Sequence, residues 1–283
     1  MKARAWSARL VVAICLPVLV AGAPGALAAA QGSGAPGPGA STTTSTSSPP
    51  GAPTSTGLPS TTGPSSTTTT TVLPGARAQA VLASAISAAN SERGLTWRAT
   101  VKAGGLSETF VGQSGREYGS QEITVGQGTG GIRLQVVLAK TKLFVSGDAA
   151  ALQGVLSLKP SVAQRLAGRW ILLSPAAGTV YQALSDGLTV ASTTVGFNMV
   201  GSLQLLPVSM VGGVPALGVR GTRSSQGVTV TETLYVRASG RQLPVELVTS
   251  AGGVSETVLF SNWGRRARVT VPSTWSTWSK SWL

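Results

Sequence analysis

The segment from residue 227 to residue 271 contains three consecutive runs in which apolar and polar residues alternate. An alternation with a period of two places every second side chain on the same side of an extended strand. Residues 238–240 and 251–253 separate the runs and supply the glycines and small residues that tight hairpins need. The segment therefore predicts an antiparallel meander with one apolar and one polar face. Residues expected on the apolar face are Val228, Val230, Leu234, Val236, Leu243, Val245, Leu247, Val258 and Phe260, with Trp263 at its end.

The chain before this meander predicts that the domain also contains helices. A helix is expected over residues 76–93, where apolar residues share one face and Gly94 follows. Five strands come next, over residues 95–102, 107–112, 117–125, 131–139 and 142–146. The period then changes, which predicts helices at residues 149–156, 161–166, 179–185 and 188–197 around a strand at 169–173. Strands resume at residue 203, so we expect one α+β domain with an antiparallel sheet over residues 76–272.

Residues 1–28 have the three parts of a secretory signal peptide. Lys2, Arg4 and Arg9 precede an apolar stretch over residues 10–20, and an Ala-Leu-Ala site ends at Ala28. We expect cleavage after this site and an exported protein, either secreted or associated with the cell envelope. The alternative is an uncleaved membrane anchor, because the apolar stretch could just reach across a bilayer.

Residues 29–75 form a linker rich in Ser, Thr and Pro that contains almost no large apolar side chain. Such a segment buries too little surface to offset the entropy of ordering, so we expect it to be disordered. Two interpretations stay open. The linker is either a stalk across a thick envelope or a disordered N-terminus without a role of its own.

The composition excludes several kinds of chemistry. The chain has no His, and its one Cys, Cys15, lies in the predicted signal peptide. A Ser-His-Asp triad is therefore excluded, and a zinc site would have to consist of carboxylates alone. We expect no enzyme activity, no metal and no cofactor.

Glu232 and Glu256 are unusual because each shares a strand face with apolar residues. An acid/base pair, a bulge, an Arg partner or a bound head group would each explain their position.

The charge and the C-terminal residues suggest surface contacts. The 22 Lys and Arg residues exceed the 9 Asp and Glu residues by 13, and basic residues cluster at Arg265, Arg266 and Arg268. Without an aromatic-rich basic platform we expect no nucleic-acid partner, and favour anionic lipid or an acidic envelope polymer as the partner.

Residues 273–283 form a tail in which Trp275, Trp278 and Trp282 share one face of a helix. We expect this tail to contact a membrane or the cavity rather than form a strand. The alternatives are that it folds back onto the outer surface of the barrel or that it is disordered.

The order of several short motifs resembles a known family. Residues 234–237, 239–240, 243–245 and 260–264 read LYVR, SG, LPV and FSNWG, and upstream pieces occur at residues 131–134, 142–145 and 168–171. Over residues 76–272 this series resembles the actinobacterial LppX/LprA/LprF/LprG lipoproteins. The resemblance implies a LolA-like fold, a curved antiparallel half-barrel sheet with helices covering the concave face and a lipid cavity between them. Those lipoproteins are acylated at a Cys, but Ile14 stands before Cys15 where a lipobox has a small residue, so we expect no lipid anchor there.

The expected function is that of an exported carrier in the cell envelope, which holds the acyl chains of a lipid or lipoglycan in an apolar cavity. The alternatives are an envelope sensor or interaction domain with the same fold and no transport role, and a structural surface protein. We expect a monomer with possible peripheral membrane contact. The side chains expected to line the cavity are Ile132, Leu134, Val136, Leu138, Met199, Val230, Leu234, Val236, Val245, Leu247, Val258 and Phe260.

Overall fold

The computed structural model describes residues 74–126, 131–225 and 228–283. The predictions made for residues 1–73 lie outside this part of the chain. They are the signal peptide, the fate of Cys15 and most of the linker.

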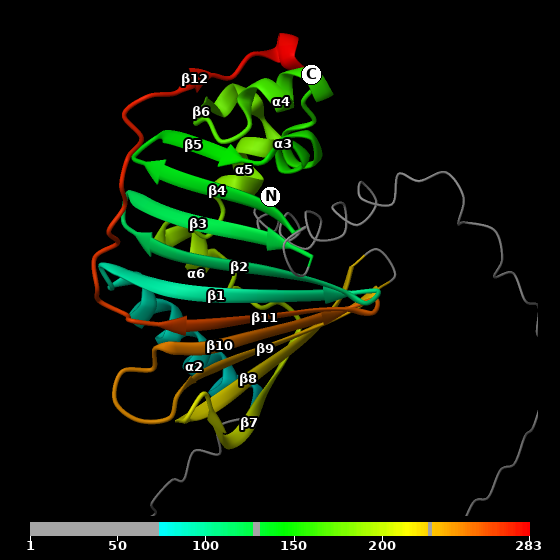
Figure 1. Ribbon diagram of the computed structural model, residues 1–283. Coiled ribbons are helices and arrows are strands. Elements are labelled where there is room, and N and C mark those ends of the chain that lie inside the picture. The colour runs from blue at the N-terminus through cyan, green and yellow to red at the C-terminus, as the bar shows by residue number, and fades with distance from the viewer. Residues whose placement is uncertain (1–73, 127–130, 226–227) are drawn as a thin grey trace, which may run out of the picture. The chain divides into compact units, whose positions relative to one another are not determined.

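Within the described residues, twelve strands form one sheet in the order β12-β6-β5-β4-β3-β2-β1-β11-β10-β9-β8-β7 (Figure 1). All neighbouring strands are antiparallel except β12 and β6, which are parallel. The sheet is open, because β12 and β7 each end it without pairing to the other. The strands are β1 (Gly94–Ala103), β2 (Leu106–Gly115), β3 (Tyr118–Val125), β4 (Ile132–Ala139), β5 (Lys142–Gly147), β6 (Ile171–Leu173), β7 (Ser202–Val211), β8 (Val214–Ser225), β9 (Val228–Arg237), β10 (Pro244–Ala251), β11 (Val254–Ser261) and β12 (Ser276–Thr277).

The helices pack against one face of this sheet, which we call the inner face. They are α2 (Pro74–Asn90), α3 (Ala149–Leu156), α4 (Pro160–Leu166), α5 (Thr179–Ser185) and α6 (Val190–Val195), with short 3-10 turns η2 (Pro175–Ala177) and η3 (Lys280–Trp282). Two of the predicted helices, 149–156 and 179–185, have the bounds of α3 and α5. The helix expected over residues 188–197 is shorter, because the side chain of Thr189 caps its start and the helix ends at Val195, with Gly196 as its C-cap.

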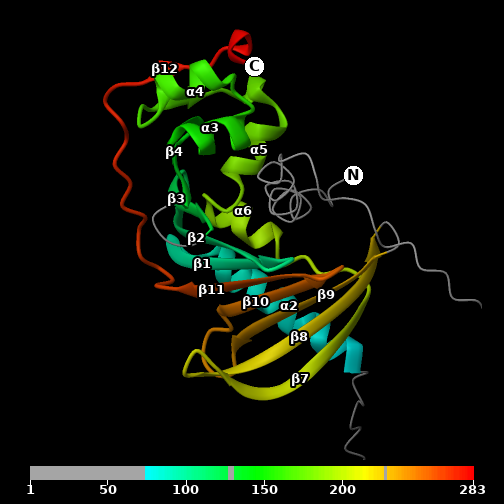
Figure 2. The same ribbon diagram turned by 45° about the vertical axis from the view of Figure 1, so that its right-hand side comes forward.

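Two groups of buried residues make up most of the core. Cluster 1 joins the inner-face side chains of β3–β6 to α3, α4 and α5, and cluster 2 joins those of β1 and β8–β11 to α2 and α6. Figure 2 shows α3 and α4 at the end of the sheet where β4 lies, and α2 beside β8–β10. The strand register places both clusters on the same face. Trp97 of cluster 2 lies opposite Gly112, and Gly112 lies opposite Gln121. Gln121 in turn lies opposite Val136 of cluster 1, and residues directly opposite each other on paired strands share a face. Phe110 packs against both clusters. The two groups of helices therefore cover different parts of one continuous sheet face.

A local irregularity changes the face of one predicted residue. The pairing of β10 with β9 shifts between Pro244 and Glu246, so that Val245 is an extra residue in its strand. Val245 does not join the core with Leu247. It packs in a small third cluster with Val211 and Ala216. The regular alternation assumed for residues 243–247 was therefore wrong at this position.

The expectation that the tail forms no strand was also wrong. Ser276 and Thr277 form β12, because the backbone N–H of Ser276 donates to the carbonyl of Trp170 at 2.9 Å and that of Trp278 to Leu172 at 3.0 Å. Trp278 and Trp282 pack against cluster 1. The ring of Trp275 meets that of Phe144 with 5.3 Å between centroids.

The three Trp residues thus follow the sheet edge and do not share one face of a helix. The membrane contact expected of Trp275, Trp278 and Trp282 stays a prediction.

A substitution at Gly119 tests the close contact between the sheet and the connection that joins α5 to α6. A Cβ added at Gly119 would lie 1.9 Å from the carbonyl oxygen of Leu188, whereas one added at Gly154 in α3 meets nothing within 4 Å. We expect Gly119→Ala to lower the free energy of unfolding by about 1–3 kcal/mol, because backbone must move. Gly154→Ala should raise it by up to about 1 kcal/mol. Urea denaturation measures both, and equal stabilities would contradict the contact.

Trp278 tests the role of the tail. Because this side chain is half-buried against cluster 1, we expect Trp278→Ala to lower the free energy of unfolding by about 2 kcal/mol. Trp275→Ala should cost less, since Trp275 is 42% exposed. Thermal denaturation and co-sedimentation with vesicles are measured on the same variants. Unchanged stability with weakened vesicle binding for Trp278→Ala would favour a membrane role over a packing role.

Candidate functional site

Four polar residues form a straight row across the inner face, which we call the carboxyl row: Glu108 on β2, Glu256 on β11, Thr249 on β10 and Glu232 on β9. The register sets this row, because Glu108 lies opposite Val101 of β1, and Val101 lies opposite Glu256. Glu256 in turn lies opposite Thr249, which lies opposite Glu232. The expected alternation therefore holds at Glu232 and Glu256, and a bulge does not explain their position.

The members of the carboxyl row are buried. Glu108 is 3% exposed and Thr249 is 4% exposed, and Glu232 and Glu256 are buried as well. Two of their atoms, Oε2 of Glu108 and Oγ1 of Thr249, have no hydrogen-bond partner. A buried polar atom left without a partner costs about 1–3 kcal/mol. Burial also raises the pKa of Glu108 from 4.5 to about 7, because desolvation disfavours the charged carboxylate. The row therefore presents hydrogen-bonding groups that the described residues do not satisfy.

The spacing of the row limits its chemistry. Neighbouring strands lie about 4.8 Å apart, so Glu108 and Glu256 are separated by about 10 Å along the sheet, as are Glu256 and Glu232. In the described part of the chain no three acidic, His or Cys side chains are placed to hold a metal ion. The spacing suits contacts with separate groups of one larger molecule.

An apolar band lies partly within the row and partly beside it on the inner face, because Val101 stands between Glu108 and Glu256. Its members Val101, Val230 and Ala251 are buried, yet they belong to neither cluster 1 nor cluster 2. Val230 lies opposite Ala251 and precedes Glu232 by two residues, which places it on the same face one step along the strand. The inner face thus carries apolar side chains next to unsatisfied polar ones, outside the areas where the helices pack.

The structure distributes the twelve predicted cavity residues over these groups. Cluster 1 contains Leu134, Val136 and Leu138, with Ile132 partly buried against it. Six more belong to cluster 2, and Val245 lies in the third cluster. Val230 alone lies in the apolar band beside the carboxyl row. The six residues of cluster 2 are Met199, Leu234, Val236, Leu247, Val258 and Phe260.

Sequence reasoning missed Glu108 and Thr249. Glu108 precedes Phe110 by two residues in a predicted strand, so its shared face with an apolar residue was the available signal. Thr249 has the same spacing to Leu247. Polar residues on an apolar strand face are informative only when the register shows that they line up across several strands.

Two of the three basic residues near the C-terminus line different recesses of the surface. Arg266 lines a pocket of about 530 Å³ with Arg93 and Arg116. Arg268 lines a different and larger groove. Arg265, Arg266 and Arg268 are all exposed, and the membrane contact expected of them stays a prediction.

No helix among the described residues is long and apolar enough to cross a membrane.

No family model and no curated protein matches the chain. Among solved structures it is similar to LprF from Mycobacterium bovis, with a TM-score of 0.47 and 14% identity over 71% of this chain and 98% of LprF. It is also similar to the lipoprotein LppX from Mycobacterium tuberculosis, with a TM-score of 0.45 and 13% identity over 68% of this chain and 99% of LppX. MucB in complex with MucA gives a TM-score of 0.34 and 16% identity, over 68% of this chain and 57% of that one. LprF and LppX are two of the proteins named in the resemblance that the sequence motifs indicate.

The raised pKa of Glu108 predicts how stability depends on pH. The unfolded chain releases this proton near pH 4.5 and the folded chain near pH 7, so the folded state holds an extra proton between these values. The contribution of Glu108 to the free energy of unfolding should therefore be complete below about pH 4.5 and fall as the pH rises to about 7. Glu108→Gln should remove this part of the slope in urea denaturation at several pH values.

The matched control is Glu117→Gln, which alters an exposed carboxyl beside β3 and should keep the slope. If wild type and Glu108→Gln respond identically to pH, Glu108 does not titrate in this range.

Proposed function

We propose that the protein is an exported lipid carrier whose ligand lies against the inner face of the sheet. Acyl chains contact the apolar band, and the polar head of the ligand meets the carboxyl row. In this proposal the sheet is a curved half-barrel, and its helices cover the concave side around the ligand. One observation carries the proposal: the unpartnered Oε2 of Glu108 and Oγ1 of Thr249 are buried directly beside apolar side chains that belong to neither main cluster.

The energetics of the two surfaces favour a ligand with two kinds of group. Each CH₂ group of an acyl chain that leaves water contributes about 0.8 kcal/mol. A hydrogen-bonding head that reaches Glu108 or Thr249 would relieve the cost of their unpartnered atoms. A purely hydrocarbon ligand would leave those atoms unsatisfied, and a purely polar one would leave the apolar band without a partner. An amphiphile satisfies both.

The sequence supports the same proposal. The motifs over residues 76–272 resemble a family of lipid-carrying lipoproteins, and residues 1–28 have the form of an export signal. We propose that the carrier works in the cell envelope on a lipid or lipoglycan, with residues 29–75 as its linker. No catalytic step is part of this function.

Thr249→Val tests the proposal, because valine keeps the shape of threonine and removes the hydroxyl. We expect lipid extracted from the purified wild-type protein to be stoichiometric by mass spectrometry. Thr249→Val should retain less of it, while the lipid-free form becomes more stable by up to about 1 kcal/mol, since an unsatisfied buried hydroxyl has gone. The absence of any bound lipid from the wild-type protein would overturn the proposal.

The matched control is Thr257→Val on β11. Thr257 is only partly buried and alternates with Glu256 and Val258, so it lies on the opposite face of the same sheet. This variant should bind lipid as the wild type does. An equal loss in both variants would mean that the carboxyl row is not part of the lipid site.

A further inference from the structure

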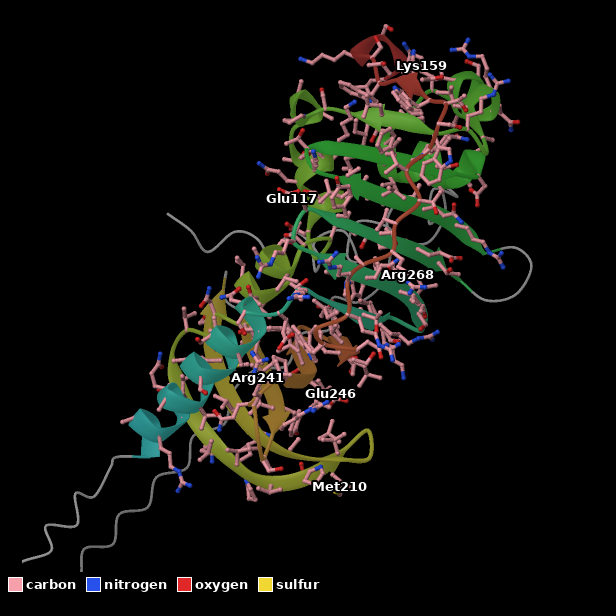
Figure 3. The ribbon with its side chains drawn as sticks, turned by 90° about the vertical axis from the view of Figure 1, so that its left-hand side faces the viewer. Glu117, Lys159, Met210, Arg241, Glu246 and Arg268 are labelled. Atoms are coloured by element: carbon pink, nitrogen blue, oxygen red, sulfur yellow. The ribbon has the colours of Figure 1, made fainter. Side chains whose placement is uncertain are left out.

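A groove of about 980 Å³ lies on the other side of the sheet from the carboxyl row. Its floor consists of residues from β10, β11 and β1–β4. Four residues of the segment that runs from β11 past the ends of the neighbouring strands toward β12 line it as well: Asn262, Trp263, Arg268 and Thr270 (Figures 1 and 3). The side chains of Arg98 and Gln113 point into it from the face opposite to Trp97 and Gly112, as the alternation along β1 and β2 requires.

Hydrogen bonds hold the C-terminal wall of the groove in place. The backbone N–H of Arg268 donates to Oε1 of Gln113 at 2.9 Å, and Nε2 of Gln113 donates back to the carbonyl of Arg268 at 2.5 Å. Farther along the groove, Nε1 of Trp263 donates to the carbonyl of Pro244 at 2.8 Å. These hydrogen bonds fix the wall to the sheet, and the groove is a built feature of the fold.

The chemistry of the groove combines positive charge with aromatic rings. Arg98, Arg237 and Arg268 line it and are exposed, and Trp170 and Trp263 line it as half-buried rings. Glu122 is the acidic residue among the lining side chains. Figure 3 labels Arg268 on the C-terminal segment and Glu246 on β10, a second carboxyl on this side, whose pKa burial raises. The lining itself thus has three positive charges against one negative charge.

We propose that this groove binds an acidic glycan chain. Guanidinium groups bind carboxylates or phosphates through paired hydrogen bonds, and the flat apolar face of a Trp ring suits the face of a sugar. The floor crosses from β10 to β4, five strand spacings or about 24 Å, which suits an extended oligomer better than a single sugar. The site lies on the opposite face from the carboxyl row and does not depend on the lipid-carrier proposal.

The fold argues against two other anionic partners. Each strand of the floor has a hydrogen-bonded neighbour on both sides, so an extended peptide finds no free edge to join. A bilayer is a flat surface and cannot follow a groove that has the C-terminal segment as a wall. A flexible chain of sugars with acidic groups fits this recess.

The test uses polygalacturonate oligomers as the acidic glycan, with uncharged dextran oligomers of matched length, and the complete mature protein. We expect the triple variant Arg98→Gln, Arg237→Gln, Arg268→Gln to bind polygalacturonate about tenfold more weakly than the wild type. The control triple variant is Arg77→Gln, Arg165→Gln, Arg169→Gln, which removes the same charge from exposed residues of α2 and of the α4 region. It should bind within about twofold of the wild type.

Trp170→Ala separates stacking from charge. We expect this variant to bind polygalacturonate several-fold more weakly than the wild type. The slope of its binding affinity against salt concentration should equal that of the wild type, because no charge has been removed. Equal losses in the two triple variants would show attraction to the overall positive charge and would overturn the site. The wild type could also bind phosphatidylglycerol vesicles or single-stranded DNA more tightly than polygalacturonate. If the triple variant of Arg98, Arg237 and Arg268 alone lost that binding, the assignment to a glycan would be overturned.

Discussion

The pairing of β1 with β11 is the contact on which the rest of the fold depends. It joins two meanders, β1–β6 and β7–β11, that are otherwise separate stretches of the chain. Its register runs antiparallel from Thr96 opposite Ser261 to Ala103 opposite Val254. The same register sets Val101 between Glu108 and Glu256, and sets Arg98 opposite Leu259 on the other face. A slip of one residue would exchange the two faces and would destroy both the carboxyl row and the groove.

The sheet therefore has two faces with different chemistry. The inner face consists of clusters 1 and 2 and an apolar band with buried carboxyls, which suits an amphiphile held out of water. The other face has exposed Arg side chains and half-buried Trp rings along a groove. The C-terminal segment that borders this groove is hydrogen-bonded to the sheet through Gln113. Because period-two alternation assigns successive residues to opposite faces, strands β1, β2, β9, β10 and β11 contribute side chains to both surfaces. The two sites that we propose, one for a lipid and one for an acidic glycan, therefore lie on opposite faces of the sheet and would not compete.

Much of this arrangement could be predicted from the sequence, and the failures have physical causes. Alternation and turn residues were sufficient for the strands of residues 227–271, and Asp148, whose side chain accepts from the backbone of Ala151, explains why α3 could be located. Val245 could not be placed, since an extra residue in a strand leaves no mark in the local pattern. The tail was mistaken for a helical surface because its partner, β6, is about one hundred residues earlier in the chain. The carboxyl row was recognised only in part, because its members come from four strands, and only their register brings them into line.

The position of β12 has a consequence for the order of events during synthesis. The chain must deliver its last residues before Trp278 and Trp282 can pack on cluster 1, and it must reach Ser261 before β1 gains its second neighbour. Pairings between such distant segments form slowly, since much chain has to be ordered for each contact. The complete sheet and the full cover of cluster 1 therefore form only when the chain has been made as far as Trp282, so the last residues of this chain close a core whose other members come from residues 110–188.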